Sequence, residues 1–241
     1  MPDIPSKEVN LHANHRQRVR EHFEKDGLDT FADHNVLEMM LFYCIPRLDT
    51  NEIAHELLNQ FGSLSGVLEA DINALLDVPG IGHESAVYIK FLNSLFRRYY
   101  IDRGKEQTMI MNDEDAKKFM EPYFLGENEE IFMAVLLDGC QNVRKIAVVD
   151  RGNEESVSVN VNRVFKEVVN NHASAVVLAH SHPNGFARPS RDDINITLEL
   201  AKKLAAINVK LCDHLIFSKN DVCFLSRDKA VPDARFFTFR E

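Results

Sequence analysis

The chain has 241 residues and a formal net charge of −9, and its 45% hydrophobic and 27% charged residues indicate a soluble globular protein of one large or two modest domains. No apolar run is long enough for a membrane span and no charged-then-apolar leader opens the chain, so we expect a cytoplasmic protein without membrane contact. The acidic balance of both halves does not favour a strong binder of duplex DNA, which draws on many neutralised phosphates.

The first part of the chain has the pattern of a small all-α domain over residues 13–101. Residues 1–12 are polar and are expected to be a mobile lead-in. Beyond them, apolar residues recur at helical spacing between cap and breaker residues. This pattern predicts helices that start at His15, cover Asp33–Cys44, run from the cap Asp49 to Phe61, and cover Ser63–Ala70, Asp71–Val78 and Val87–Tyr100. Residues 102–112 are polar, lose this spacing and are predicted to be a linker.

The segment Gly80-Ile81-Gly82 lies between two predicted helices and resembles the helix-hairpin-helix motif of DNA-repair and replication proteins. In such a motif a tight glycine turn brings backbone N–H groups and a helix N-terminus close to a phosphate, without reading bases. Glu84 departs from the motif, because DNA-binding versions often have Lys or Arg there and a carboxylate repels phosphate. Two interpretations stay open: weak, nonspecific DNA contact through Gly80, Ile81 and Gly82, or a structural hairpin or partner surface.

From residue 113 the pattern changes to alternating helices and strands, which predicts an α/β domain over 113–241. The predicted elements are the helix Asp113–Phe124, the strands Ile131–Leu137, Val143–Asp150 and Val157–Val161, the helix Asn162–Asn171, a buried strand over Ala175–Ala179, the helix Ile194–Ala206, and the strands Val209–Leu211, His214–Phe217 and Val222–Leu225. Phe236, Phe237 and Phe239 in the tail are expected to dock against the domain rather than form a site.

Candidate metal ligands follow the apolar run Ala175–Ala179. Side chains alternate along a strand, so His180 and His182 are expected to project from the same face. The helical spacing that follows places Asp193 in the first turn of the next helix. Two imidazoles and a carboxylate are the donor types of a catalytic zinc site, which leaves its fourth position to water. Taken alone, Ser190 and Asp193 also match a helix N-cap with its acidic partner, and the histidines match ordinary surface or hydrogen-bonded residues.

His180, His182, Ser190 and Asp193 together form the pattern His-x-His-x7-Ser-x2-Asp, whose four fixed positions match by chance on the order of once per million starting points. The pattern resembles the JAMM, or MPN-plus, metal signature. The run Ala-His-Ser-His-Pro-Asn-Gly and the later Cys-Asp-His-Leu-Ile are similar to the RadC family of bacterial JAMM proteins, and the resemblance covers about residues 15–228. It implies a cytidine-deaminase-like mixed sheet with flanking helices, preceded by the small all-α helix-hairpin-helix domain.

The same resemblance implies a zinc-dependent hydrolase that cleaves an amide or isopeptide bond of an unidentified protein or peptide. Family members carry a strand glutamate that holds the attacking water at the metal. Glu130 matches it, and its neighbour Glu129 stays open as an alternative. Ser190 would steady the oxyanion of the tetrahedral intermediate, and the same hydroxyl could cap the helix. His214 is either a structural histidine or a contact behind the metal ligands.

Other functions stay open beside this hydrolase. The ligand triad alone would also suit a deaminase-like hydrolysis. The family's repair label points to a DNA-associated protein, in which the hairpin docks on nucleic acid. A third alternative is a noncatalytic interaction module that keeps the metal for stability. Zinc uptake, salt-sensitive DNA retention and substrate turnover separate these alternatives.

Overall fold

A computed structural model describes residues 14–104, 109–152, 161–219, 221–228, 237 and 239. By its internal contacts the chain divides into two compact units, Met1–Ser94 and Leu95–Glu241, and the division falls within helix α6 (His83–Gly104). The predicted lead-in 1–12 lies outside the described residues, as do residues 105–108 of the predicted linker, so the predicted domain boundaries stay predictions. No helix in the described ranges combines the length and the apolar character that crossing a membrane requires.

Helices alone form the described part of the first unit. They are α1 (His15–Asp26), α2 (Asp33–Leu41), α3 (Thr50–Phe61), α4 (Leu64–Glu69), α5 (Ile72–Leu76) and the first part of α6. The predicted cap Asp49 accepts a backbone N–H of the first turn of α3 through a side-chain oxygen, and Ser63 and Asp71 cap α4 and α5 in the same way. The apolar faces of α2 and α3 meet in one core, in which Leu37, Leu57 and their neighbours are fully buried.

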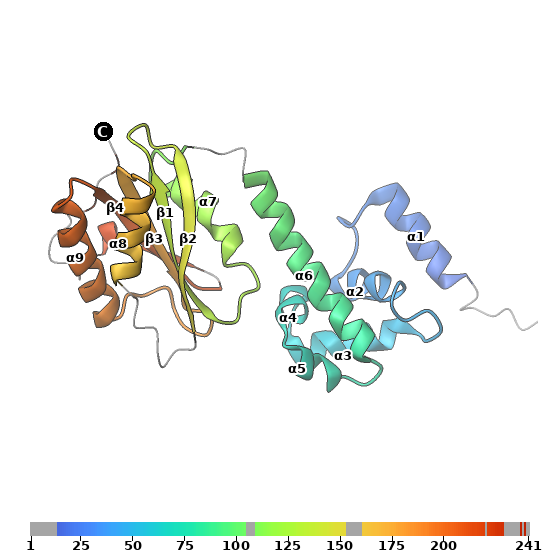
Figure 1. Cartoon of the computed structure of the whole chain (residues 1–241). Coiled ribbons are helices and arrows are strands. Elements are labelled where there is room, and N and C mark those ends of the chain that lie inside the picture. The colour runs from blue at the N-terminus through green and yellow to red at the C-terminus, as the bar shows by residue number, and fades with distance from the viewer. Residues whose placement is uncertain are drawn as a thin grey trace, which may run out of the picture. The chain divides into compact units, whose positions relative to one another are not determined.

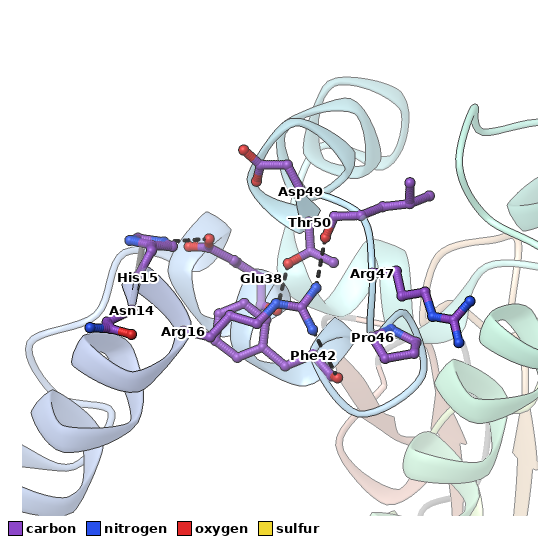
Figure 2. Close-up of a pocket in the computed structure, with 10 residues that line it drawn as sticks. Asn14, His15, Arg16, Glu38, Phe42, Pro46, Arg47, Asp49 and Thr50 are labelled. Carbon is purple, nitrogen blue, oxygen red and sulfur yellow. Dashed lines mark hydrogen bonds and ion pairs between the residues drawn. The ribbon is translucent and has the colours of Figure 1, made fainter. Parts of the chain in front are cut away.

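Helix α1 joins the rest of this unit through polar contacts, since none of its residues is buried. The guanidinium group of Arg16 donates to the main-chain carbonyls of Ile45 and Leu48, each at 2.7 Å, in the loop that follows α2. Figure 2 shows this guanidinium group beside the ring of Phe42. Beside it, Nε2 of His15 lies 2.7 Å from a carboxylate oxygen of the buried Glu38. Charged and polar groups therefore hold α1 in place where an amphipathic helix would use an apolar stripe.

The second unit is built on a mixed five-stranded sheet, as expected (Figure 1). Its strands are β1 (Glu130–Leu137), β2 (Val143–Gly152), β3 (Ala175–Ser181), β4 (Lys210–Phe217) and β5 (Val222–Phe224). They lie in the order β2-β1-β3-β4-β5, with β3 and β4 parallel and the other neighbouring pairs antiparallel. The parallel pair is connected through a helix: the chain leaves β3 at Ser181, passes through a loop over 182–190 and enters α9 (Arg191–Ala205) before it reaches β4.

Helices cover both faces of this sheet. On one face, α8 (Val161–Asn170) and α9 (Arg191–Ala205) pack against alternate residues of β1 and β3, among them Phe132 and Leu178. On the other face, α7 (Asp113–Met120) and the 3₁₀ turn η1 (Glu121–Tyr123) pack against the intervening residues, such as Val135 and Val177. All residues of β3 are buried, which agrees with the apolar run that predicted it.

Three predicted strands differ from the structure. The expected strand 157–161 falls mostly outside the described residues, and Val161 begins α8, where its side chain is buried with the other inward-facing valines. The two short strands expected on either side of Cys212 and Asp213 form one strand, β4, with a bulge at those residues. In the tail, Phe237 is buried, as expected for a docked end, and it forms an isolated parallel bridge with Leu211; Phe236 lies outside the described residues. A 3₁₀ turn, η2 (Leu225–Arg227), follows β5.

Candidate metal centre

The end of β3 brings His180 and His182 together. His180 faces the α8 and α9 side of the sheet, where its ring stacks beside Phe132, and His182 follows two residues later on the same face. The Nε2 atoms of the two imidazoles lie 2.8 Å apart. Nδ1 of His182 lies 3.1 Å from the Phe186 carbonyl oxygen. Because a carbonyl can only accept, Nδ1 of His182 carries the proton of this contact, and in a neutral ring Nε2 is then an acceptor.

Helix α9 adds the carboxylate of Asp193. Its Oδ1 lies 3.2 Å from Nε2 of His180 and its Oδ2 lies 3.7 Å from Nε2 of His182. The ligand atoms of these three residues all lie within 4.8 Å of one another, and no other such group occurs among the residues that the structure describes. The structure therefore brings together the three residues that the sequence predicted as metal ligands.

Ser190 is the N-cap of α9 and forms a capping box with Asp193. The Ser190 hydroxyl accepts the Asp193 backbone N–H at 3.1 Å, and the Ser190 backbone N–H donates to Oδ2 of Asp193 at 2.7 Å. The helix-cap interpretation is thus correct for both residues. It does not compete with metal binding, because the capping box holds Oδ2 of the carboxylate and leaves Oδ1 directed toward His180.

Electrostatics favour an ionised carboxylate at this place. Burial alone would raise the pKa of Asp193, but the hydrogen bond and charge of His180, together with hydrogen bonds from Ser190, lower it well below its usual value. Burial also lowers the pKa of His214, with a further contribution from the charge of His180, so His214 is neutral at neutral pH. Asp193 is thus an ionised carboxylate beside the two histidines, the state that a metal ligand needs, and the neutral His214 lies behind them.

Glu130 opens β1, on the strand next to the histidines. Phe132 pairs with His180, and side chains alternate, so Glu130 lies on the same face of the sheet as both. The pairing of β1 with β3 ends at Phe132 and His180, so Glu130 lies two residues beyond the last pair on β1, as His182 lies two residues beyond it after β3. Glu129 lies one residue before β1, so the alternation of side chains directs it away from the face that Glu130 shares with His180. Its main-chain carbonyl accepts from the Ser181 hydroxyl at 3.4 Å. The register therefore favours Glu130 over Glu129 as the glutamate that faces the histidines.

Two further residues lie directly behind the ligands. Nδ1 of His180 lies 2.9 Å from Nε2 of His214, and Nδ1 of His214 lies 2.6 Å from Oγ1 of Thr197. The Thr197 hydroxyl also donates to the Asp193 carbonyl at 2.5 Å. The sequence left the role of His214 open and did not single out Thr197. The only indication for Thr197 was its position one helical turn after Asp193, where a threonine can reach back to that carbonyl.

In the first unit, Gly80, Ile81 and Gly82 lie between α5 and α6. Gly80 has φ +89°, and a Cβ atom there would lie 2.7 Å from Cδ1 of Ile53, so the turn needs glycine for two reasons. The side chain of Ile81 is buried in the helical core, and its backbone N–H donates to the Val78 carbonyl at 3.1 Å. DNA contact through these residues stays a prediction, with the Ile81 N–H already engaged within the turn.

Comparison with known proteins agrees with this architecture. Residues 110–230 match the family model described as the RadC-like JAB domain, which spans the sheet, α9 and the metal centre. The chain is also 36% identical over 213 residues to the "UPF0758 protein FN0909" of Fusobacterium nucleatum, in an alignment that covers 86% of this chain and 92% of that protein. The chain belongs to the RadC family.

Proposed function

We propose that this protein is a zinc-dependent hydrolase that cleaves an amide or isopeptide bond in a protein or peptide. One observation carries the proposal: His180, His182 and Asp193 converge at the end of β3 within 4.8 Å of one another. Two nitrogen ligands and one oxygen ligand with a further open position are the donor set of catalytic rather than structural zinc sites.

The protonation pattern supports the fit to a cation. In a neutral His182 ring Nε2 is an acceptor, and the carboxylate of Asp193 is ionised and can only accept. Nε2 of His180 lies close to both of these acceptors. Acceptors this close repel one another unless a proton or a metal ion lies among them. A mixed imidazole and carboxylate set favours zinc over magnesium or calcium, which prefer oxygen ligands alone.

When bound, zinc supplies Lewis-acid chemistry, making water a nucleophile at neutral pH and polarising the scissile carbonyl. In the proposed mechanism Glu130 takes the proton of the attacking water and returns it to the leaving amine. The hydroxyl of Ser190 steadies the developing oxyanion. Both roles come from the family resemblance, and the placement of Glu130 on the same face as Phe132 and His180 supports the first.

Metal content tests the proposal. Elemental analysis of the purified protein should give about one zinc per chain, and the double variant His180→Ala, His182→Ala should give none. The matched control is His34→Ala, His55→Ala, which removes a stacked pair of histidines from the first unit, 4.4 Å apart between ring centroids. Zinc retained by the first variant, or absent from the wild type, would contradict the proposal.

Turnover tests the catalytic part. Wild-type protein should release new N-termini from a library of bacterial peptides, and Glu130→Gln should abolish this release while it keeps zinc at the wild-type level. Glu129→Gln is the control and should cleave normally. If Glu129→Gln is the inactive variant, the base is Glu129. Zinc binding without turnover of any peptide or isopeptide would favour the noncatalytic interaction module instead.

DNA association is the second alternative, and the described residues contain no observation that favours it over the hydrolase. Glu84 is 96% exposed in the first turn of α6, where it opposes a phosphate at that helix N-terminus. Weak, nonspecific contact through Gly80, Ile81 and Gly82 would appear as retention on duplex DNA that disappears with salt.

A further inference from the structure

We propose that Thr197 and His214 are positioning residues that decide which nitrogen of His180 carries a proton. Neither is among the proposed metal ligands. The two form a chain of hydrogen bonds from the backbone of α9, through β4, to the His180 ring on β3. The inference rests on the proposed metal site, because its consequence is a His180 Nε2 lone pair that is turned toward the metal.

The Thr197 hydroxyl makes two short contacts. It lies 2.5 Å from the Asp193 main-chain oxygen and 2.6 Å from Nδ1 of His214. Each contact needs one hydrogen between its two atoms, and the hydroxyl has only one to give. A carbonyl oxygen supplies none, so the hydroxyl hydrogen lies on the Asp193 side. Nδ1 of His214 must then be the donor to Thr197.

This assignment fixes the other nitrogen of His214. His214 is 1% exposed, and a second proton would leave an imidazolium ion buried in the sheet, so the ring is neutral with a lone pair on Nε2. That lone pair faces Nδ1 of His180 at 2.9 Å. The hydrogen in this contact therefore belongs to Nδ1 of His180, and a neutral His180 carries its lone pair on Nε2, the atom 3.2 Å from Oδ1 of Asp193.

The opposite direction does not satisfy the same contacts. If Nε2 of His214 donated to His180, Nδ1 of His214 would accept from Thr197, and the 2.5 Å contact with the Asp193 carbonyl would contain no hydrogen. His180 would then hold its proton on Nε2, where it blocks a metal. Water cannot substitute for a missing partner, because Thr197, His214 and His180 are only 1%, 1% and 5% exposed.

Two structural features bring Thr197 and His180 within hydrogen-bond distance of His214. Thr197 lies one turn after Asp193, so α9 carries both the carboxylate of the candidate site and the first residue of the hydrogen-bond series Thr197–His214–His180. The bulge in β4 shifts the alternation by one residue, which pairs His214 with Leu178 and turns its ring to the face of the metal centre. Metal-binding histidines commonly have their second nitrogen fixed by such a partner.

The first test measures the proton positions directly. Long-range proton–nitrogen correlation spectra of the metal-free, full-length protein, labelled at histidine nitrogen, distinguish an imidazole that is protonated at Nδ1 from one protonated at Nε2. We expect His214 to be protonated at Nδ1 only and His180 to be protonated at Nδ1. A wild-type His214 protonated at Nε2 would overturn the inference, and this outcome does not depend on whether zinc binds.

The second test uses Thr197→Val, which keeps the shape and removes the hydroxyl. We expect the His214 proton to shift toward Nε2 and the zinc affinity, measured by competition with a chelator, to fall about 10- to 100-fold. Thr197→Ser restores the hydroxyl and should return both readings to within about threefold of wild type. Thr50→Val is the matched control, because Thr50 is also 1% exposed and its hydroxyl also donates to a main-chain carbonyl, that of Glu38.

The two failures are distinguishable. Absence of zinc from the wild type rejects the proposed function, and the spectra of the metal-free protein still decide the positions of the protons. Wild-type zinc binding together with an unchanged His214 proton and unchanged affinity in Thr197→Val rejects the positioning role alone. An equal loss of affinity in Thr50→Val would also reject it, because a distant buried hydroxyl would then have the same effect.

Discussion

The carboxylate of Asp193 interacts with both Ser190 and His180, and each uses a different oxygen. One carboxylate oxygen accepts the Ser190 backbone N–H, and the other faces His180. Asp193→Asn keeps an oxygen for the Ser190 N–H but removes the negative charge, so we expect helix content to stay and zinc affinity to fall at least about 100-fold. Chelator competition and far-ultraviolet circular dichroism measure the two effects.

Asp192→Asn is the control for this prediction. Asp192 is exposed in the same first turn, so the variant makes the same change of charge without touching the histidines. A parallel loss of affinity in both variants would mean that Asp193 acts through the general field of the helix N-terminus, not as a ligand.

Ser190 allows its cap role to be separated from its proposed catalytic role. Ser190→Ala removes the oxygen that accepts the Asp193 N–H and should lower the free energy of unfolding by about 1 kcal/mol, whereas Ser190→Gly should cost only a few tenths of a kcal/mol. Both remove the hydroxyl, so both should lower turnover by about 10²- to 10³-fold if it steadies an oxyanion. Urea denaturation and peptide cleavage give the comparison. Turnover that follows stability across the two variants would leave Ser190 as a cap alone.

At the scale of elements, α1 is held by polar contacts, so the loss of one polar side chain should affect its stability strongly. Arg16→Ala removes the donors to the Ile45 and Leu48 carbonyls, which leaves α1 with no buried apolar residue and with polar contacts such as that of His15 with Glu38. We expect amide hydrogen exchange in α1 to accelerate at least about tenfold while α3 stays protected.

Lys25→Ala is the matched control on the same helix. The Lys25 side chain is 81% exposed and its ion pair is with the adjacent Asp26, so its removal should leave exchange in α1 close to wild type. Equal acceleration by the two variants would show that α1 responds to lost positive charge in general, and not to the Arg16 contacts.

The elements also show how far the sequence could predict the structure. The apolar run of β3, the His-x-His pair and the Ser190 cap follow local rules of periodicity and capping, and the structure agrees with each. The interruption at Cys212 and Asp213 was visible, but as a break between two strands. Whether such a break is a loop or a bulge depends on pairing with β3, which is a tertiary contact. Without that pairing, the meeting of His214 with Thr197 could not be predicted.

At the scale of the whole molecule, the two faces of the sheet differ in kind. The face toward α8 and α9 carries the candidate metal centre, while the face toward α7 carries a buried acid, Asp213. Asp213 pairs with Val177 and accepts hydrogen bonds from the backbone of His214 and from Ser226. Burial nevertheless raises its pKa to about 6, despite these hydrogen bonds. This acid therefore makes the stability of the fold depend on pH.

The raised pKa of Asp213 determines the direction in which stability changes with pH. Between its ordinary value of 3.8 and about 6, the folded protein keeps the proton that the unfolded chain has lost, so stability falls as pH rises through this range and then levels off. A shift of about two pKa units corresponds to about 3 kcal/mol. Asp213→Asn cannot ionise, and its amide can still accept from His214 and donate to Ser226. We expect it to match wild type near pH 4 and to be more stable by up to about 3 kcal/mol at pH 7.

Hydrogen exchange of β4 amides, corrected for the intrinsic rate at each pH, measures this difference locally. Asp138→Asn is the opposite control, because backbone and side-chain hydrogen bonds from Asn142 lower the pKa of Asp138, so its ionised form stabilises the fold. That variant should lose stability relative to wild type as pH rises toward about 4 and should then keep a constant deficit from pH 4 to pH 7, the range in which Asp213→Asn gains stability. A gain for Asp213→Asn that is the same at pH 4 and pH 7 would mean that the amide packs better than the acid, and that the buried charge of Asp213 has no part in the pH dependence.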